Sequence, residues 1–62
     1  MKAETLILNH PDAKAVVAKM LKEKAISAGT AQFLRNFIER QAYWGGYGMA
    51  ASLETKVREY FS

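Results

Sequence analysis

The chain has 62 residues, of which 50% are apolar, and a net charge of +3 from nine basic and six acidic side chains. This length allows one small domain, residues 1–62, and the absence of cysteine excludes disulfides and thiolate metal sites. No apolar run approaches the ~20 residues of a membrane span and no signal-peptide pattern is present, so we expect a cytoplasmic protein without a membrane segment.

Residues 3–9, AETLILN, have the composition of a short β-strand. The segment has no N-terminal cap, and its threonine, leucines and isoleucine are all acceptable strand formers. With a period of two, Thr5, Ile7 and Asn9 share one face. No other segment resembles a strand, so its backbone must pair with a second copy, pair with another protein or lie extended across the helices.

The segment from about residue 11 to 24 is predicted to be the first of three helices. Proline is favoured in the first helical turn, and Asn9 or His10 can cap the helix. The apolar residues follow the i, i+3, i+4, i+7, i+8 spacing of a single helical face: Ala13, Val16, Val17, Met20 and Leu21. We therefore expect this face to be buried.

A second helix is predicted from about residue 28 to 43, after Ser27 as N-cap. Its apolar arc includes Phe33, Leu34, Phe37 and Ile38. The stretch SAGT places two hydroxyls and a glycine beside the unpaired backbone amides at the positive end of this helix. Two interpretations follow, namely an anion site and ordinary capping with nothing bound.

The stretch YWGGYG, residues 43–48, separates the second helix from a third, predicted from about residue 49 to 61. Its glycines favour a helix end followed by a turn, with Trp44 folded into the core. Tyr43 and Tyr47 have two interpretations: they can stack on bases or anchor a protein interface, or their hydroxyls can simply close the loop by hydrogen bonding.

Catalysis has little support in the residues. His10 is the only histidine, and no second histidine or cysteine can complete a nucleophile–base pair or a metal cluster. The GGYG run follows a helix and is not followed by Lys-Ser/Thr, so it does not match a nucleotide-binding loop. The sequence predicts a non-enzymatic protein with no cofactor, no metal and no small-molecule substrate.

The strand, the proline-led helix, the serine-containing turn and the helix FLRNFI together resemble the ribbon-helix-helix repressor family over residues 3–43. In that family two chains pair their N-terminal strands and place them in the major groove of DNA. The resemblance implies a homodimer, with the missing strand supplied by the second copy. The turn reads Ala25-Ile26-Ser27 where the family carries Gly-x-Ser/Thr.

The resemblance also assigns roles to particular residues. By this likeness the base-contacting face consists of Thr5, Ile7 and Asn9. The phosphate anchor consists of Ser27, Gly29 and Thr30. Lys2 and Lys24 add supporting charge.

Two functions are predicted. The first is a small DNA-binding regulator that acts as a dimer on duplex DNA, favoured by the N-terminal strand, the basic balance and the N-terminus of the second helix. The alternative is a helical protein-interaction module, an adaptor or inhibitor, that uses Tyr43, Tyr47 and the exposed edge of the N-terminal strand.

Overall fold

The computed structural model describes residues 2–40 and 50–62. It contains four helices over these residues: α1 (Ala3–Asn9), α2 (Ala13–Lys22), α3 (Ala28–Arg40) and α4 (Ala51–Phe61). The three helices predicted at 11–24, 28–43 and 49–61 correspond to α2, α3 and α4. Residues 41–43 and 49 of those predicted ranges lie outside the described residues.

Residues 3–9 form helix α1, so the predicted N-terminal strand is wrong, and so is a dimer formed by pairing two such strands. No described residue belongs to a β-strand. The physical reason is a helical stripe, because Ala3, Leu6, Ile7 and His10 recur at i, i+3, i+4 and i+7. Ala3 and Ile7 are buried. A helix also bonds its backbone within the segment, which a lone strand cannot do.

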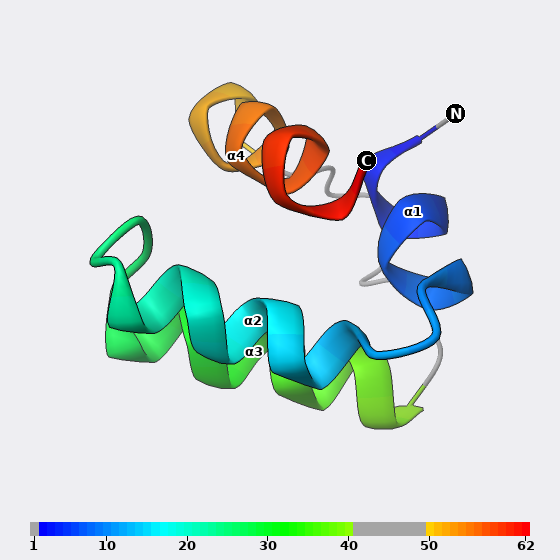
Figure 1. Ribbon diagram of the computed structural model, residues 1–62, viewed down its shortest axis with the longest axis horizontal. Helices are drawn as coiled ribbons and strands as arrows, with labels where there is room; N and C mark the ends of the chain where they lie inside the picture. The colour runs from blue at the N-terminus through cyan, green and yellow to red at the C-terminus, as the bar shows by residue number, and fades with distance from the viewer. Residues whose placement is uncertain (1, 41–49) are drawn as a thin grey trace.

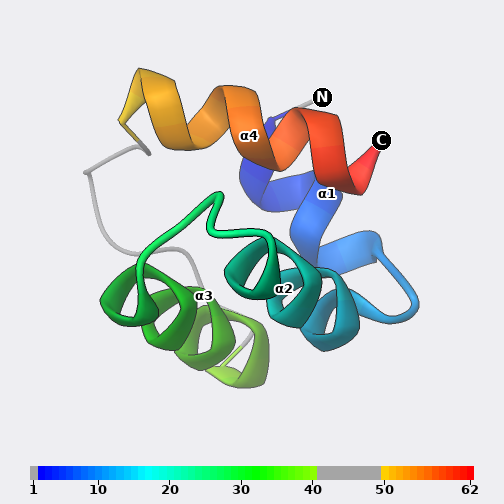
Figure 2. The same cartoon turned by 60° about the vertical axis from the view of Figure 1, so that its left-hand side comes forward.

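The helices are arranged as two pairs. Helices α2 and α3 form an antiparallel hairpin, whereas α1 packs mainly against α4 (Figure 1). Helix α4 crosses over the hairpin at a steep angle, as Figure 2 shows from a second direction. Helix α1 lies at the end of the hairpin opposite the α2–α3 turn (Figure 1).

One core joins the four helices. Every helix contributes buried apolar side chains to it: Ala3, Ile7, Ala13, Val17, Met20, Ala31, Leu34, Phe37, Val57 and Phe61. No polar or charged side chain is buried in the part of the chain that the structure describes. Any polar binding surface on the described residues must therefore lie on the outside of the helices.

The start of α2 is fixed by His10. Its ring Nδ1 accepts a hydrogen bond from the backbone N–H of Asp12 at 3.0 Å, and the ring meets Phe61 edge-on at 5.4 Å. The side chain thus satisfies one amide near the helix start and joins α1, α2 and α4, which is a structural role.

Candidate nucleic-acid interface

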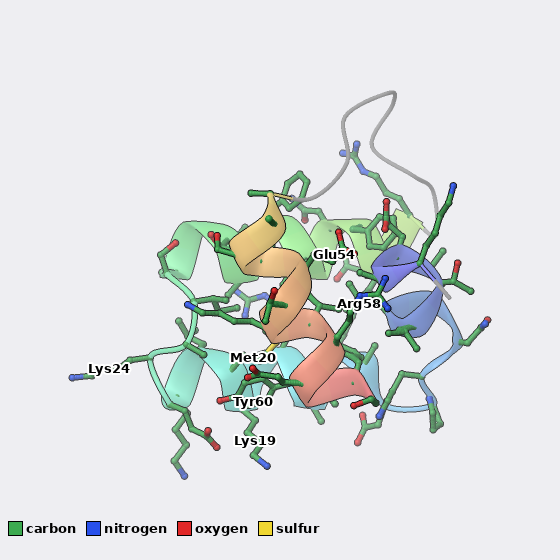
Figure 3. The ribbon with its side chains drawn as sticks, turned by 90° about the horizontal axis from the view of Figure 1, so that it is seen from above. Lys19, Met20, Lys24, Glu54, Arg58 and Tyr60 are labelled. Carbon is green, nitrogen blue, oxygen red and sulfur yellow. The ribbon has the colours of Figure 1, made fainter. Side chains whose placement is uncertain are left out.

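The α2–α3 turn is closed by a Schellman motif. The N–H of Lys24 donates to the carbonyl of Leu21 at 3.0 Å, and the N–H of Ala25 donates to that of Met20 at 2.9 Å. This pattern requires a left-handed residue after the helix end, and Lys24 adopts it with φ of 59°. Lysine therefore occupies a position that usually belongs to glycine, and its side chain projects beyond the hairpin (Figure 3).

Three exposed lysines lie in the last turn of α2 and in the chain turn that follows it, namely Lys19, Lys22 and Lys24, and we call them the lysine cluster. None of the ion pairs found among residues 2–40 and 50–62 involves these three lysines. Lys14 pairs with Glu39 at 2.9 Å, and Arg58 pairs with Glu54 at 3.0 Å. The lysine cluster thus presents three charges without a carboxylate partner in the described part of the chain.

The N-terminus of α3 follows the cluster directly. The Ser27 hydroxyl accepts the backbone N–H of Thr30 at 3.1 Å and donates to the Thr30 hydroxyl at 3.0 Å. Ser27 therefore caps the N-terminus of α3, as predicted. The preceding amides, of Ala28 and Gly29, belong to the first turn, where a helix has no acceptor of its own. A side chain added at Gly29 would approach only the Ser27 hydroxyl, at 3.9 Å, so packing does not require glycine there.

Helix α4 contributes a fourth lysine to the same end. The Lys56 ammonium donates to the carbonyl of Ala25 at 2.6 Å and so ties α4 to the turn. A cavity of about 320 Å³ lies between these elements. It is lined by Ala25, Ile26, Ser27, Thr30, Ala50, Ser52, Leu53 and Lys56.

Tyr60, also on α4, organises the other side of the cluster. Its hydroxyl donates to the carboxylate of Glu23 at 2.6 Å, and the Lys19 ammonium lies 6.0 Å from the centre of its ring. The hydrogen bond to Glu23 is the main cause that raises the pKa of Tyr60, with smaller effects of burial and of the charges of Glu23 and Glu59. Figure 3 shows Tyr60 and Lys19 on the same side of α4.

The structure brings together only part of the predicted site. Lys24, Ser27, Gly29 and Thr30 lie at the turn end, as the hairpin requires. The remaining predicted contacts belong to α1 or its N-terminal flank, at the opposite end of the hairpin: Lys2, Thr5, Ile7 and Asn9.

The base-reading face that was assigned to α1 does not exist as a strand face. The Ile7 side chain has 0% exposure in the core, so it cannot reach a thymine methyl in this fold. Thr5 is half-buried, whereas Lys2 and Asn9 are exposed. Tyr43 and Tyr47, the predicted partner-binding residues, lie outside the described residues, as does Trp44.

Sequence reasoning missed Lys56 and Tyr60. Both belong to α4, and the contacts that bring them to the turn join positions 31 and 37 residues apart. Neither residue belongs to a local motif, so the sequence carries no short-range signal for them.

Comparison with known proteins gave no match to a family model, a curated protein or a solved structure. The ribbon-helix-helix resemblance therefore stays a prediction from the sequence, without the paired strands that gave it a base-reading surface. Within the described ranges, no helix has the length and apolar character that a membrane crossing requires, and no three potential metal ligands cluster.

Proposed function

We propose that the protein is a small non-enzymatic DNA-binding regulator that holds the phosphate backbone of duplex DNA at the α2–α3 turn. The single observation that carries this proposal is the lysine cluster, whose exposed charges have no carboxylate partner among the described residues. Clustered lysines bind phosphates by replacing condensed counterions, which makes such binding strongly dependent on salt.

The chemistry of the turn end favours phosphate over bases. Lysine acts as a point charge and lacks the forked geometry with which arginine, asparagine or glutamine reads a base edge. The first-turn amides of α3 add a positive helix end beside the cluster. We therefore expect binding that positions the protein on the duplex and depends weakly on base sequence.

A second copy is not needed for this mode of binding. Because residues 3–9 are helical, strand pairing gives no reason for a dimer. The protein-docking alternative also loses its strand edge, and its two tyrosines, Tyr43 and Tyr47, lie outside the described residues. Protein binding therefore becomes an outcome of the test.

The test is binding of a fluorescent duplex, measured by anisotropy over a range of salt concentrations. Three to four lysine–phosphate contacts should give a log–log slope of about −2.7 to −3.6. Lys24→Gln should reduce the magnitude of this slope by about 0.9, because one contact is removed.

Lys2→Gln is the matched control, since it removes the same charge at the opposite end of the molecule and should leave the slope unchanged. Equal effects of the two variants would show that net charge alone matters. No binding at micromolar protein in low salt would overturn the proposal, and stoichiometric capture of a protein through Tyr43 and Tyr47 would favour the alternative.

A further inference from the structure

Glu23 is the carboxylate closest in sequence to the lysine cluster. It lies between Lys22 and Lys24 and four residues after Lys19, a spacing at which side chains on a helix can pair. It is also the C-cap of α2, where a negative charge is unfavourable because the helix end is itself negative. On α2 alone, this carboxylate would be drawn towards the neighbouring lysines.

Helix α4 gives Glu23 another partner. The Tyr60 hydroxyl donates to the Glu23 carboxylate at 2.6 Å, within the range of a charge-assisted hydrogen bond. The Lys19 ammonium lies near the Tyr60 ring, 6.0 Å from its centre, and Glu23 is not among the ion-paired residues of the described chain. The tyrosine thus contacts both partners of a possible ion pair that is not formed.

We propose that Tyr60 is a positioning residue that holds the Glu23 carboxylate out of the lysine cluster and so keeps the cluster cationic for DNA phosphates. This inference rests on the proposed function and adds to it a residue that touches no nucleic acid. Without the hydroxyl, Glu23 is free to pair with Lys19 and to repel an approaching phosphate.

Tyr60→Phe tests this with a minimal change, since it removes the hydroxyl and keeps the ring that packs on the core and lies near Lys19. The variant should bind the duplex about three- to tenfold more weakly at low salt, with a salt slope smaller by about 0.9. Circular dichroism should show unchanged helix content.

A double-mutant cycle with Glu23→Gln separates positioning from a general structural role. Once the carboxylate is gone, Tyr60→Phe should no longer weaken binding, so the double variant should match Glu23→Gln within about a factor of 2. A loss caused by altered packing would persist in both backgrounds.

The outcomes are distinct. The role of Tyr60 is overturned if Tyr60→Phe leaves duplex binding unchanged. It is also overturned if Tyr60→Phe weakens binding equally with and without the Glu23 carboxylate. In both cases the DNA-binding proposal stands, because the wild-type protein binds. Absence of wild-type binding at low salt overturns both. Restoration of binding by Glu23→Gln in the Tyr60→Phe background supports the positioning role.

Discussion

Lys24 adopts a left-handed backbone conformation, with φ of 59°, at the position where a Schellman motif usually carries glycine. A residue with a Cβ atom pays about 1–2 kcal/mol for this conformation. Its amide donates to the carbonyl of Leu21, so the strain is maintained by the turn itself. A lysine at this position supplies a positive charge that glycine cannot.

Lys24→Gly should therefore affect stability and binding in opposite directions. We expect the free energy of unfolding to rise by about 1 kcal/mol, because glycine adopts positive φ without steric cost. Duplex affinity should fall, because one phosphate contact is lost. Urea denaturation and salt-dependent anisotropy measure the two effects.

The matched control for this substitution is Lys24→Ala. It removes the same charge but keeps the Cβ atom, so it should weaken DNA binding equally without the gain in stability. A Lys24→Gly protein that binds duplex DNA as tightly as wild type would contradict the proposal that the Lys24 charge contacts a phosphate.

The hydrogen bond between Tyr60 and Glu23 predicts that the stability of the folded protein depends on pH in the alkaline range. The hydrogen bond to Glu23 raises the pKa of Tyr60 above its ordinary value of 10.0. Since the folded-state pKa is the higher one, the stabilisation is fully present below the unfolded pKa and is lost as pH rises through the raised value. Glu23→Gln should lower the pKa of Tyr60, which the NMR shift of its ring carbon beside the hydroxyl reports.

Glu59→Gln serves as the comparison for this titration. Glu59 acts on Tyr60 only through its charge and is the smallest of the causes, so its removal should lower the Tyr60 pKa less than Glu23→Gln does. Equal effects of the two substitutions would mean that general negative charge, and not the hydrogen bond, dominates.

At the scale of elements, helices α2, α3 and α4 could be predicted from the sequence because each is at least ten residues long and repeats its apolar positions with the helical period. Helix α1 could not, because seven residues make only two turns and the run Leu6-Ile7-Leu8 is compatible with either period. The stripe of Ala3, Leu6, Ile7 and His10 fits the helical period, but over so short a segment it does not exclude a strand. Burial of Ala3 and Ile7 in the core, with α1 packed against α4, favours the helix.

The residues of the candidate site also fall into two groups, those that local sequence motifs predict and those that only tertiary packing brings to the site. The capping role of Ser27 and the charge of Lys24 belong to local motifs, so residues near the turn could be predicted. Lys56 and Tyr60 reach the turn only because α4 folds back over the hairpin. Their roles follow from tertiary packing, which spacing along one helix cannot reveal.

Helix α1 offers a direct test of this packing. Ile7 is fully buried, and truncation of a buried aliphatic side chain to alanine costs about 2–5 kcal/mol. We expect Ile7→Ala to destabilise the protein by this amount, a large part of the total of about 3–9 kcal/mol that a domain of this size has. Chemical denaturation measures the loss.

Asn9→Ala is the control, because Asn9 is exposed on the same helix and its substitution should change stability by no more than about 0.5 kcal/mol. Below the denaturation midpoint, the folded fraction of Ile7→Ala should keep its affinity for duplex DNA. A stable Ile7→Ala protein with lost affinity would instead favour a direct role of α1 in binding.

At the scale of the whole molecule, the arrangement of charge matters more than the net value of +3. The ion pairs Lys14–Glu39 and Arg58–Glu54 offset cations on the hairpin and on α4. The lysine cluster is left at the end of the hairpin that α1 does not reach (Figure 1). Lys2, Arg35 and Arg40 are also outside these ion pairs, but they are spread over other parts of the described chain, whereas the lysine cluster brings three such charges within six residues.

The proposed DNA binding would be coupled to folding, because only the folded chain brings Lys56 to the same end as Lys19, Lys22 and Lys24. A ligand at 100 times its Kd stabilises the folded state by about 2.7 kcal/mol. For a domain of this size we expect saturating duplex at low salt to raise Tm by about 10–20 °C, measured by circular dichroism. The shift should disappear at high salt, where counterion release no longer favours binding. A Lys19→Gln/Lys22→Gln/Lys24→Gln variant should lose most of the shift, and a shift that survives these substitutions would place the interface on another face of the protein.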